Sequence, residues 1–302
     1  MNGVIVIDKP EDFTSFDVVA VVRKATGQRK TGHTGTLDPN ATGVLPVLLG
    51  NATKAQDIIP NHDKSYIADF RLGEVSDTLD IWGEIKHFSD KKVEKCQIET
   101  LLDEFTGEIE QIPPMYSAVK VNGQRLYDLA RQGIEIERKS RKVTVYSLRL
   151  TSFDEDTQTG TFQIDCSKGT YVRTLIDDIG RKLGTGALMT SLRRTQACGY
   201  NLSDCITLEQ LKELCESGEI ENRIKSAESL FAGLEMIAVS SAQAKRFSNG
   251  GALDISRTSL AKKKFADGDI FRVSERDGKF LGLGITDKEN SLLKIYKLFP
   301  EG

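Results

Sequence analysis

The chain has 302 residues, of which 39% are hydrophobic and 28% are charged, and its net charge is −3. These are ordinary globular values, so the composition excludes a disordered or fibrous chain and allows one large domain with a small one, or two domains. No apolar run is long enough to span a membrane, and the N-terminal sequence MNGVIVIDKP lacks the basic flank and cleavage site of a signal peptide. We therefore expect a cytoplasmic protein with no membrane association.

The N-terminal third predicts a strand over residues 3–9 and a helix over 14–27, which Thr14 or Ser15 could cap and Gly27 could end. The next segment, GHTGTLDPNATGVLPV at residues 32–47, carries a single acid, Asp38, before a proline. Asp before Pro is displaced from the helical region and readily starts a turn. From the local pattern alone, a plain structural turn is the favoured interpretation.

The rest of the chain predicts strands over residues 65–73, 141–154 and 160–169, and helices over 93–107 and 170–184, the second ending at Gly184. After about residue 232 the sequence changes to short strand-like runs around Gly and Asp turns, with an acidic helical stretch before it as the junction. An α+β chain with a small β-rich C-terminal domain is therefore expected.

The cysteines and histidines form no metal-ligand pattern. The five cysteines are odd in number and include no C-x-x-C pair, and the three histidines, His33, His62 and His87, are scattered. Neither a disulfide framework nor a zinc site is indicated. We expect no metal and no cofactor.

Charge is sorted along the chain. Residues 118–149 hold eight Lys and Arg against three acids, whereas residues 203–230 hold seven acids against three bases. A basic segment in a chain of low net charge is compatible with local nucleic-acid binding and equally with a solvated helix or loop. The run of Lys262, Lys263 and Lys264 forms a second, smaller basic group.

Six blocks, in this order, resemble the TruB family of bacterial tRNA pseudouridine synthases. They are NGVIVIDKP, GHTGTLDPNATGVLPV, KSYIADFRLGEVSDTLD, PPMYSAVKVNGQRLYDLARQGIEIERKSRKVTVY, CSKGTYVRTLIDDIG and SLRRT. Ordered blocks of this kind are far more specific than one short motif. The similarity covers most of residues 1–200, and the C-terminal segment resembles the small PUA RNA-binding domain that often follows in this family.

The resemblance implies an α+β pseudouridine synthase fold around a mixed, mainly antiparallel sheet. It implies a catalytic domain over residues 1–230 with an RNA-binding insertion at about 117–142, and a PUA-like domain over 232–302. The implied reaction converts the uridine at tRNA position 55, in the T loop, to pseudouridine without metal or organic cofactor. A tRNA-folding activity would be a second function of the same surface.

The resemblance implies a catalytic role for Asp38, with Arg173 as its pairing partner. A carboxylate that faces an apolar pocket needs a cation beside it to stay charged. Tyr66 matches the aromatic residue that stacks on the target base, and its phenol could also remove a proton from C5. Without the resemblance, Tyr66 reads as a core strand tyrosine and Arg173 as an exposed residue at a helix start.

Other family positions predict contacts with the substrate. Tyr171 and Leu192 match residues that line the uridine pocket, although both also read as ordinary core residues. His33 matches the histidine that fills the space vacated by flipped bases. The RNA-binding candidates within the basic segment are Lys120, Arg125, Tyr127, Arg131, Lys139, Arg141 and Lys142.

Three hypotheses remain at this level. The first is a monomeric, stand-alone isomerase whose partner is the T arm of tRNA. The second is an RNA-binding or RNA-folding protein without catalysis, and the third is an RNA-guided relative inside a multi-protein particle. The pairing of Asp38 with Arg173 favours catalysis over binding alone, and the basic insertion favours direct contact with tRNA over guidance.

Overall fold

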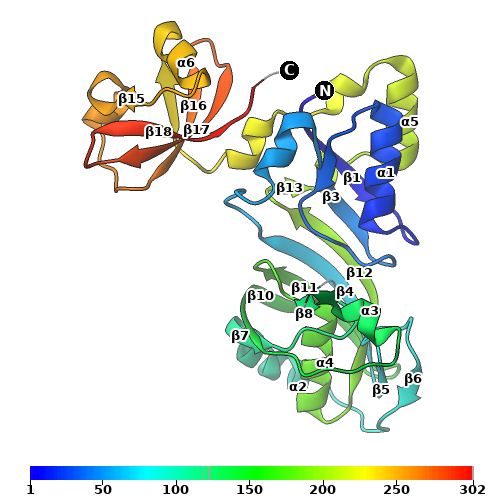
Figure 1. Ribbon diagram of the computed structural model, residues 1–302. Helices are drawn as coiled ribbons and strands as arrows, with labels where there is room; N and C mark the ends of the chain where they lie inside the picture. The colour runs from blue at the N-terminus through cyan, green and yellow to red at the C-terminus, as the bar shows by residue number, and fades with distance from the viewer. Residues whose placement is uncertain (118, 122, 301–302) are drawn as a thin grey trace.

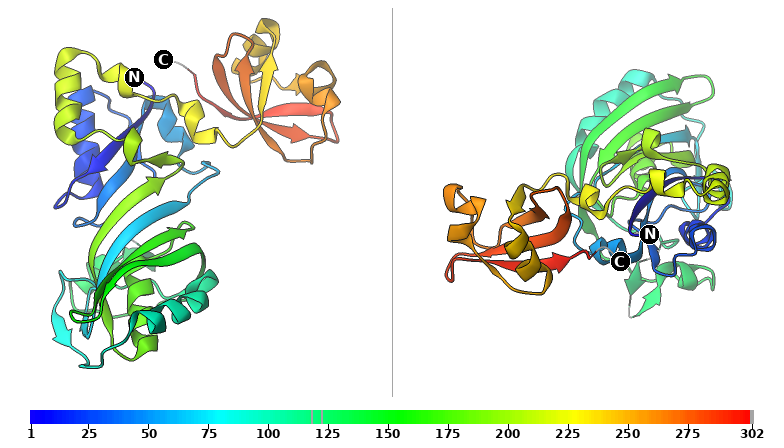
Figure 2. Two further views of the ribbon diagram at one scale, coloured as in Figure 1. Left: turned by 180° about the vertical axis from the view of Figure 1, so that it is seen from behind. Right: turned by 90° about the horizontal axis from the view of Figure 1, so that it is seen from above.

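The computed structural model describes residues 1–117, 119–121 and 123–300, without the side chains of Lys120 and Arg125. Figure 1 shows a large mixed sheet through the main body of the molecule and a smaller sheet beside it. Both chain ends reach the same place, because Asn51 donates its backbone N–H to the Asn2 side chain (2.8 Å) and its amide to the Pro300 carbonyl (2.8 Å). The turned views of Figure 2 also show the two termini close together.

The main sheet has nine strands in the order β1-β3-β12-β4-β11-β10-β7, with β13 on β12 and β2 on β3. Its strands are β1 (Gly3–Lys9), β2 (Thr31–His33), β3 (Thr42–Leu49), β4 (Lys64–Leu72), β7 (Gly107–Gln111), β10 (Arg141–Asp154), β11 (Thr159–Cys166), β12 (Ala187–Ala197) and β13 (Tyr200–Asn201). All neighbouring pairs are antiparallel except β3 with β12. The predicted mixed, mainly antiparallel sheet is confirmed.

Helices cover the sheet where the sequence places amphipathic segments. Helix α1 (Ser15–Thr26) starts with a capping box on Thr14 and ends at the left-handed Gly27, as predicted. Helix α4 (Val172–Leu183) ends at Gly184, also as predicted. Within the described residues, the structure contains no helix with the length and apolar character needed to cross a membrane.

One helical prediction differs from the structure in its extent. The segment expected to be helical over 93–107 contains α2 (Lys95–Leu101) and then a tighter 3₁₀ turn (Leu102–Phe105), because the chain must turn into β7 at Gly107, whose φ is 95°. The acidic helical stretch expected before the C-terminal segment is present as α5 (Leu208–Ser217). It packs through Leu211 into the same core as α1 and β1, since its apolar face matches theirs.

The insertion lies between β7 and β10 and is built from short elements. A hairpin of β8 (Lys120–Val121) and β9 (Gln124–Arg125) leads into α3 (Leu126–Ala130), and residues 131–140 continue as turns and irregular chain. Leu126 and Leu129 of α3 are buried, which anchors the insertion to the body. A second small hairpin is formed by β5 (Glu74–Ser76) and β6 (Ile85–His87).

The C-terminal residues form the smaller sheet, which confirms the expected β-rich segment. Its order is β14-β16-β17-β18-β15, with α6 (Ser241–Ser248) packed against it. The strands are β14 (Met236–Val239), β15 (Leu253–Asp254), β16 (Ile270–Glu275), β17 (Phe280–Asp287) and β18 (Leu292–Leu298). Phe231 stacks with Phe280 and tilts against Phe299, so an aromatic cluster joins this sheet to the main body.

Candidate active site

Asp38 lies on the loop that connects β2 to β3. The Asp38 carbonyl accepts a hydrogen bond from the Ala41 N–H (3.1 Å), and Pro39 occupies the second position of this four-residue turn. The turn predicted from sequence is thus present, and it holds out a carboxylate whose side chain is 43% exposed. The apolar strand β3 follows at once and fixes the end of the loop in the core.

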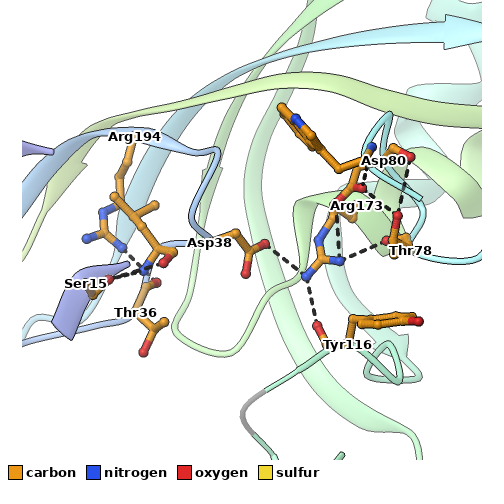
Figure 3. A network of polar contacts seen from close by, with 10 residues as sticks. Ser15, Thr36, Asp38, Thr78, Asp80, Tyr116, Arg173 and Arg194 are labelled. Carbon is orange, nitrogen blue, oxygen red and sulfur yellow. Dashed lines mark hydrogen bonds and ion pairs between the residues drawn. The ribbon is translucent and has the colours of Figure 1, made fainter. Parts of the chain in front are cut away.

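Buried polar groups hold this loop in place. The Ser15 hydroxyl accepts from the Leu37 N–H (2.9 Å), and the Arg194 guanidinium donates to the carbonyls of Gly35 (3.2 Å) and Thr36 (3.3 Å) (Figure 3). Arg194 is fully buried in β12. A planar guanidinium offers several donors in a fixed arrangement, so one side chain can set the path of two peptide units next to Asp38.

Lys9 fixes the same loop from β1. Its ammonium is fully buried and donates to the carbonyls of Pro39 (2.7 Å) and Phe13 (2.6 Å). Burial lowers the pKa of Lys9 to about 8, and the nearby charge of Asp38 opposes that shift. A buried ammonium requires hydrogen-bond acceptors, and one of those of Lys9 is the carbonyl of Pro39 in the Asp38 turn. Lys9 therefore holds this turn in place.

Arg173 forms the predicted ion pair with Asp38. It stands in the first turn of α4, and one guanidinium nitrogen is 2.9 Å from Asp38 Oδ2. The guanidinium also donates to the carbonyls of Thr78 (2.8 Å) and Tyr116 (3.0 Å). The other carboxylate oxygen, Oδ1, makes no hydrogen bond to any residue that the structure describes. It is the oxygen that a substrate could meet.

Asp80 is a second carboxylate on the same arginine. Its Oδ2 lies 3.5 Å from Arg173, and its Oδ1 accepts from the Thr78 hydroxyl (2.6 Å) and the Trp82 N–H (3.1 Å). Burial raises the pKa of Asp80, while the hydrogen bond from Thr78 and the charge of Arg173 oppose that rise. Arg173 is therefore placed between an exposed acid and a buried one (Figure 3), which fixes its own position.

A cavity of about 370 Å³ adjoins Asp38 and brings the predicted uridine-pocket residues together. Tyr66 and Leu192 enter from the adjacent strands β4 and β12, and Tyr171 enters from the residue before α4. The Gln111 side chain holds the Tyr171 backbone through its N–H (3.0 Å) and its carbonyl (3.3 Å). Four segments far apart in sequence thus form one small chamber beside a carboxylate, with two tyrosine rings and a leucine in its wall.

Tyr66 is the most buried of these lining residues. Burial raises the pKa of its phenol to about 12, and the neighbouring Arg194 charge acts in the opposite direction. The phenol is therefore neutral at physiological pH in the free protein. Because the phenol is neutral, the ring can stack on a base without burying a negative charge. Removal of a proton by the phenol would require Arg194 to stabilise the ionised form of Tyr66.

A wider cavity of about 720 Å³ lies on another side of Asp38, and His33 and Tyr127 line it together. His33 packs edge-on against Phe16, with ring centroids 5.4 Å apart, and its buried Nδ1 has no hydrogen-bond partner among the described residues. Burial, followed by the charge of Arg194, lowers the pKa of His33. The neutral imidazole is compatible with packing among bases, and the cavity brings the insertion and the Asp38 loop to one place.

The RNA-binding candidates are not equivalent in the structure. The Arg131 guanidinium lies over the Tyr127 ring (4.9 Å to the centroid), and both line the wider cavity. Lys139 and Arg141 are exposed, whereas Lys142 is paired with Glu108 (2.8 Å). The side chains of Lys120 and Arg125 lie outside the described residues. Contact with RNA remains a prediction for all of them.

Sequence reasoning did not single out Lys9, Asp80 or Arg194. A signal was present for two of them, because Lys9 ends an apolar strand and Arg194 belongs to SLRRT, one of the six blocks that carry the resemblance. A charge in an apolar strand requires a buried partner. Asp80 also stands among apolar neighbours, Leu79, Ile81 and Trp82, but no strand or helix was predicted there. Among the described residues, no group of three or more His, Cys, Asp or Glu side chains lies close enough to hold a metal ion.

Two family models match the chain. The model described as TruB family pseudouridylate synthase, N-terminal domain, matches residues 23–172, and the model described as tRNA pseudouridylate synthase B, C-terminal domain, matches residues 173–232. Together they include Asp38, Tyr66, Arg173 and Arg194.

Curated relatives agree over the full length. A tRNA pseudouridine synthase B from Clostridium acetobutylicum is 44% identical over 298 residues, which is 99% of each chain. One from Clostridium perfringens is 43% identical over 304 residues, which is 100% of each chain.

Solved structures show the same fold at greater distance. An H/ACA ribonucleoprotein bound to a substrate RNA containing 2′-deoxyuridine aligns with a TM-score of 0.75 at 25% identity, over 99% of this chain and 85% of that one. A Cbf5–Nop10–Gar1 complex aligns with a TM-score of 0.75 at 27% identity, over 98% and 84%. With the resemblance of the six sequence blocks thus confirmed over its whole length, the chain belongs to the TruB family of pseudouridine synthases.

Proposed function

We propose that this enzyme isomerises uridine 55 in the T loop of tRNA to pseudouridine. The observation that supports it most directly is the Asp38 carboxylate, held 2.9 Å from Arg173 at a chamber that Tyr66, Tyr171 and Leu192 line. The curated relatives that match over the full length are named tRNA pseudouridine synthase B. Asp38, Tyr66 and Arg173 are the proposed catalytic residues.

The reaction requires a bond exchange without redox change. The bond from uracil N1 to ribose C1′ breaks, the base turns within the chamber, and a bond from C5 to C1′ forms. N1 gains a proton and C5 loses one, so the atoms balance without water or a second substrate. A small chamber with the side chains of Tyr66, Tyr171 and Leu192 in its wall suits this chemistry, because the detached uracil must be kept from solvent and from leaving.

Each side chain has a role that fits its position. Asp38 Oδ1 is open to the substrate and would act on the ribose, either as a nucleophile at C1′ or as a base at C2′. Arg173 keeps the carboxylate oriented and balances its charge. Tyr66 would stack on the uracil, and its phenol would give its own proton to N1 and take up the C5 proton, with Arg194 stabilising the ionised form between the two transfers. Tyr171 and Leu192 would close the chamber around the base, and His33 would occupy space left by displaced bases.

The basic insertion would bring the T arm to this chamber. C1′ and C5 are hidden inside a folded RNA loop, and unstacking a nucleotide costs a few kcal/mol, so contacts to the phosphate backbone must offset the cost. Tyr127 and Arg131 of the insertion already face the wider cavity beside Asp38. The insertion thus supports direct binding of tRNA over guidance by another RNA.

The C-terminal segment 232–302 would add a PUA-like RNA-binding domain to the catalytic domain 1–230. Lys262 and Lys264 are exposed there, while Lys263 pairs with Glu235. Nop10 and Gar1 accompany the protein in one of the similar structures. We propose that this chain acts as a monomer without such partners. The proposed tRNA substrate implies a reaction in the cytoplasm.

The proposal is tested with purified protein and unmodified tRNA that carries tritium at C5 of uridine. Tritium release in the presence of EDTA, confined to one T-loop uridine and lost in a tRNA with cytidine at position 55, is the expected result. Asp38→Asn, which keeps the shape of the side chain and removes its charge, should lower turnover by at least about 10³-fold. It should bind tRNA nearly as the unchanged protein does.

Retained turnover in a folded Asp38→Asn protein would overturn the assignment of the site. A strict need for a metal ion in the chemical step, with the RNA correctly folded, would contradict the metal-free reaction. The same variant also separates catalysis from a tRNA-folding activity. If it still promotes refolding of misfolded tRNA, the binding surface carries a second function that does not require the carboxylate.

A further inference from the structure

The chamber beside Asp38 has basic groups in its wall that the proposed chemistry does not use. Lys64, the first residue of β4, and Lys168, in the turn before α4, line the cavity together with His62. Lys64 is partly buried and Lys168 is exposed. Groups able to carry positive charge therefore lie around the same 370 Å³ space as the reactive carboxylate.

Within the described residues, neither lysine has an acidic partner. The Lys64 ammonium donates to the His62 carbonyl (2.6 Å), and the Lys168 side chain makes no hydrogen bond or ion pair. The carboxylate of Asp63, the residue before Lys64, accepts instead from the Tyr146 hydroxyl (3.2 Å). The positive charge at this wall is thus left for a ligand.

The electrostatics of the wall agree with this geometry. Burial lowers the pKa of His62, and the charges of Lys168 and Lys64 lower it further. Burial lowers the pKa of Lys64 as well, followed by the charge of Arg194. The two lysine charges thus disfavour charge on His62 while the charge of Asp63 favours it, and a bound anion would act in the same direction as Asp63.

The backbone beside Lys168 also offers donors. Gly169 has φ of 87°, and a Cβ at this position would meet nothing within 4 Å, so the turn faces open space. The N–H groups of Lys168 and Gly169 have no acceptor among the described residues. Free amides in a turn of this conformation are a recognised kind of anion site, which here coincides with the two lysines.

We propose that Lys64, Lys168 and the turn at Gly169 bind a backbone phosphate of the nucleotide whose base enters the chamber. The inference rests on the proposed function, since it takes RNA as the ligand. A uridine with its ribose beside Asp38 carries its own phosphates to the chamber wall, where Lys64 and Lys168 lie. The site would hold the flipped nucleotide itself and so offset part of the cost of unstacking.

A phosphate-by-lysine cycle tests this site. A set of T-arm RNAs would each carry one uncharged methylphosphonate linkage, placed 5′ of the target uridine, 3′ of it, or in the distant stem. The affinity of each RNA would be measured for two proteins, the Asp38→Asn variant and the same variant with Lys168→Gln added. We expect one linkage beside the uridine to weaken binding about three- to tenfold when Lys168 is present, as for a charge-assisted contact at a partly exposed position. In the protein that also carries Lys168→Gln, the same linkage should weaken RNA binding by less than about twofold.

Lys212→Gln is the matched control, because Lys212 is an exposed lysine on α5; it should keep the full methylphosphonate penalty. Lys64→Gln should reduce the penalty as Lys168→Gln does. The site would be refuted if the methylphosphonate linkage weakened RNA binding equally in proteins that keep both lysines and in proteins that lack them, with thermal stability unchanged. Because the cycle measures binding only, it is read independently of the tritium assay, in which failure of the unchanged protein would refute the proposed function itself.

Discussion

The Asp38 chamber and the insertion at about 117–142 hold their charged groups in opposite ways. In the chamber, Arg173 has a side chain only 6% exposed and donates to fixed carbonyl acceptors. In the insertion and the strand after it, Lys139 and Arg141 are exposed, and the ion pair of Lys142 with Glu108 has both side chains more than 60% exposed. One region fixes geometry, and the other presents charge to solvent.

This difference assigns separate tasks to the two regions. A buried guanidinium with satisfied donors keeps a carboxylate in one orientation, and such preorganisation is what a chemical step requires. Exposed charges contribute little to stability but attract a polyanion, with a strength that falls as salt rises. Substitutions in the chamber should therefore change turnover and folding together, whereas substitutions in the insertion should change affinity alone.

The largest expected effect comes from Arg173→Ala. It leaves the Asp38 and Asp80 carboxylates without their cation, and the loss of one partner from a buried pair typically costs about 3 to 5 kcal/mol. Since Asp38 is partly exposed, we expect the free energy of unfolding to fall by about 3 kcal/mol, with turnover nearly abolished. Urea denaturation and single-turnover tritium release measure the two effects.

Arg173→Lys is the control for charge. An ammonium keeps the charge but cannot reach Asp38 and the carbonyls of Thr78 and Tyr116 in the fixed arrangement of a guanidinium. It should recover part of the stability and little of the turnover. Wild-type stability and turnover in Arg173→Ala would show that the pair has no role in either.

Tyr66 separates stacking from proton transfer within the chamber. Tyr66→Ala removes a ring whose stacking on a base is typically worth about 1 to 3 kcal/mol, and it should weaken positioning of the uridine and reduce turnover strongly. Tyr66→Phe keeps the ring and removes the phenol. We expect near-normal RNA binding and a loss of turnover of about 10²-fold, the lower range for a lost general base. Full turnover in Tyr66→Phe would leave Tyr66 with stacking alone.

Neutralising Lys139, Arg141 and Lys142 together should act on affinity alone. Each lost phosphate contact reduces the salt slope of binding by about 0.7 to 0.9, and because Lys142 is already paired with Glu108, we expect a loss equivalent to two contacts, about 1.4 to 1.8. Titrations of tRNA binding at several salt concentrations measure the slope. Single-turnover rates at saturating protein should stay unchanged, and an unchanged slope would mean that this segment is a solvated face.

Lys139→Gln and Lys142→Gln form a matched pair for this prediction. The unpaired Lys139 should contribute more to the slope than the paired Lys142. An equal contribution would indicate that the Glu108 ion pair opens when RNA binds.

The smallest effect concerns pH and again distinguishes the chamber from the surface. Burial raises the pKa of the Cys166 thiol to about 11, from an ordinary value near 9, and Cys166 belongs to the same core as Tyr66. Because the folded protein keeps this proton after the unfolded chain has lost it, the contribution to stability is complete below pH 9 and is lost as pH rises toward 11. The slope for one such group is at most about 1.4 kcal/mol per pH unit.

Urea denaturation between pH 8.5 and 10.5 tests this sign. Cys166→Ala removes the ionisable group and should make stability fall less steeply with pH, although its stability at pH 8 is lower because of the small cavity. Cys96→Ala, at an exposed position, should leave the slope unchanged. A wild-type slope in Cys166→Ala would show that other buried acids, such as the phenol of Tyr66, account for the fall.

Local sequence determined the elements of this protein and its basic and acidic segments. Helix α1 with its Thr14 cap and Gly27 end, the strands β1, β4, β10 and β11, and the turn at Asp38 follow from capping, periodicity and proline chemistry, which act within a few residues. The six ordered blocks added Asp38, Tyr66 and Arg173 as site residues. The bounds of α2 could not be predicted in this way, because they depend on the turn into β7.

Only the tertiary structure decided which charges, apart from Arg173, meet at the Asp38 loop. Lys9, Asp80 and Arg194 are distant from Asp38 along the chain or lack a local signal, and they reach the site because β1, β3, β12 and β4 are assembled in one sheet and α4 is packed beside it. A buried charge is tolerated only where the whole fold supplies its acceptors. The partners of a buried lysine or arginine are therefore a property of the assembled sheet, and no spacing in the sequence specifies them.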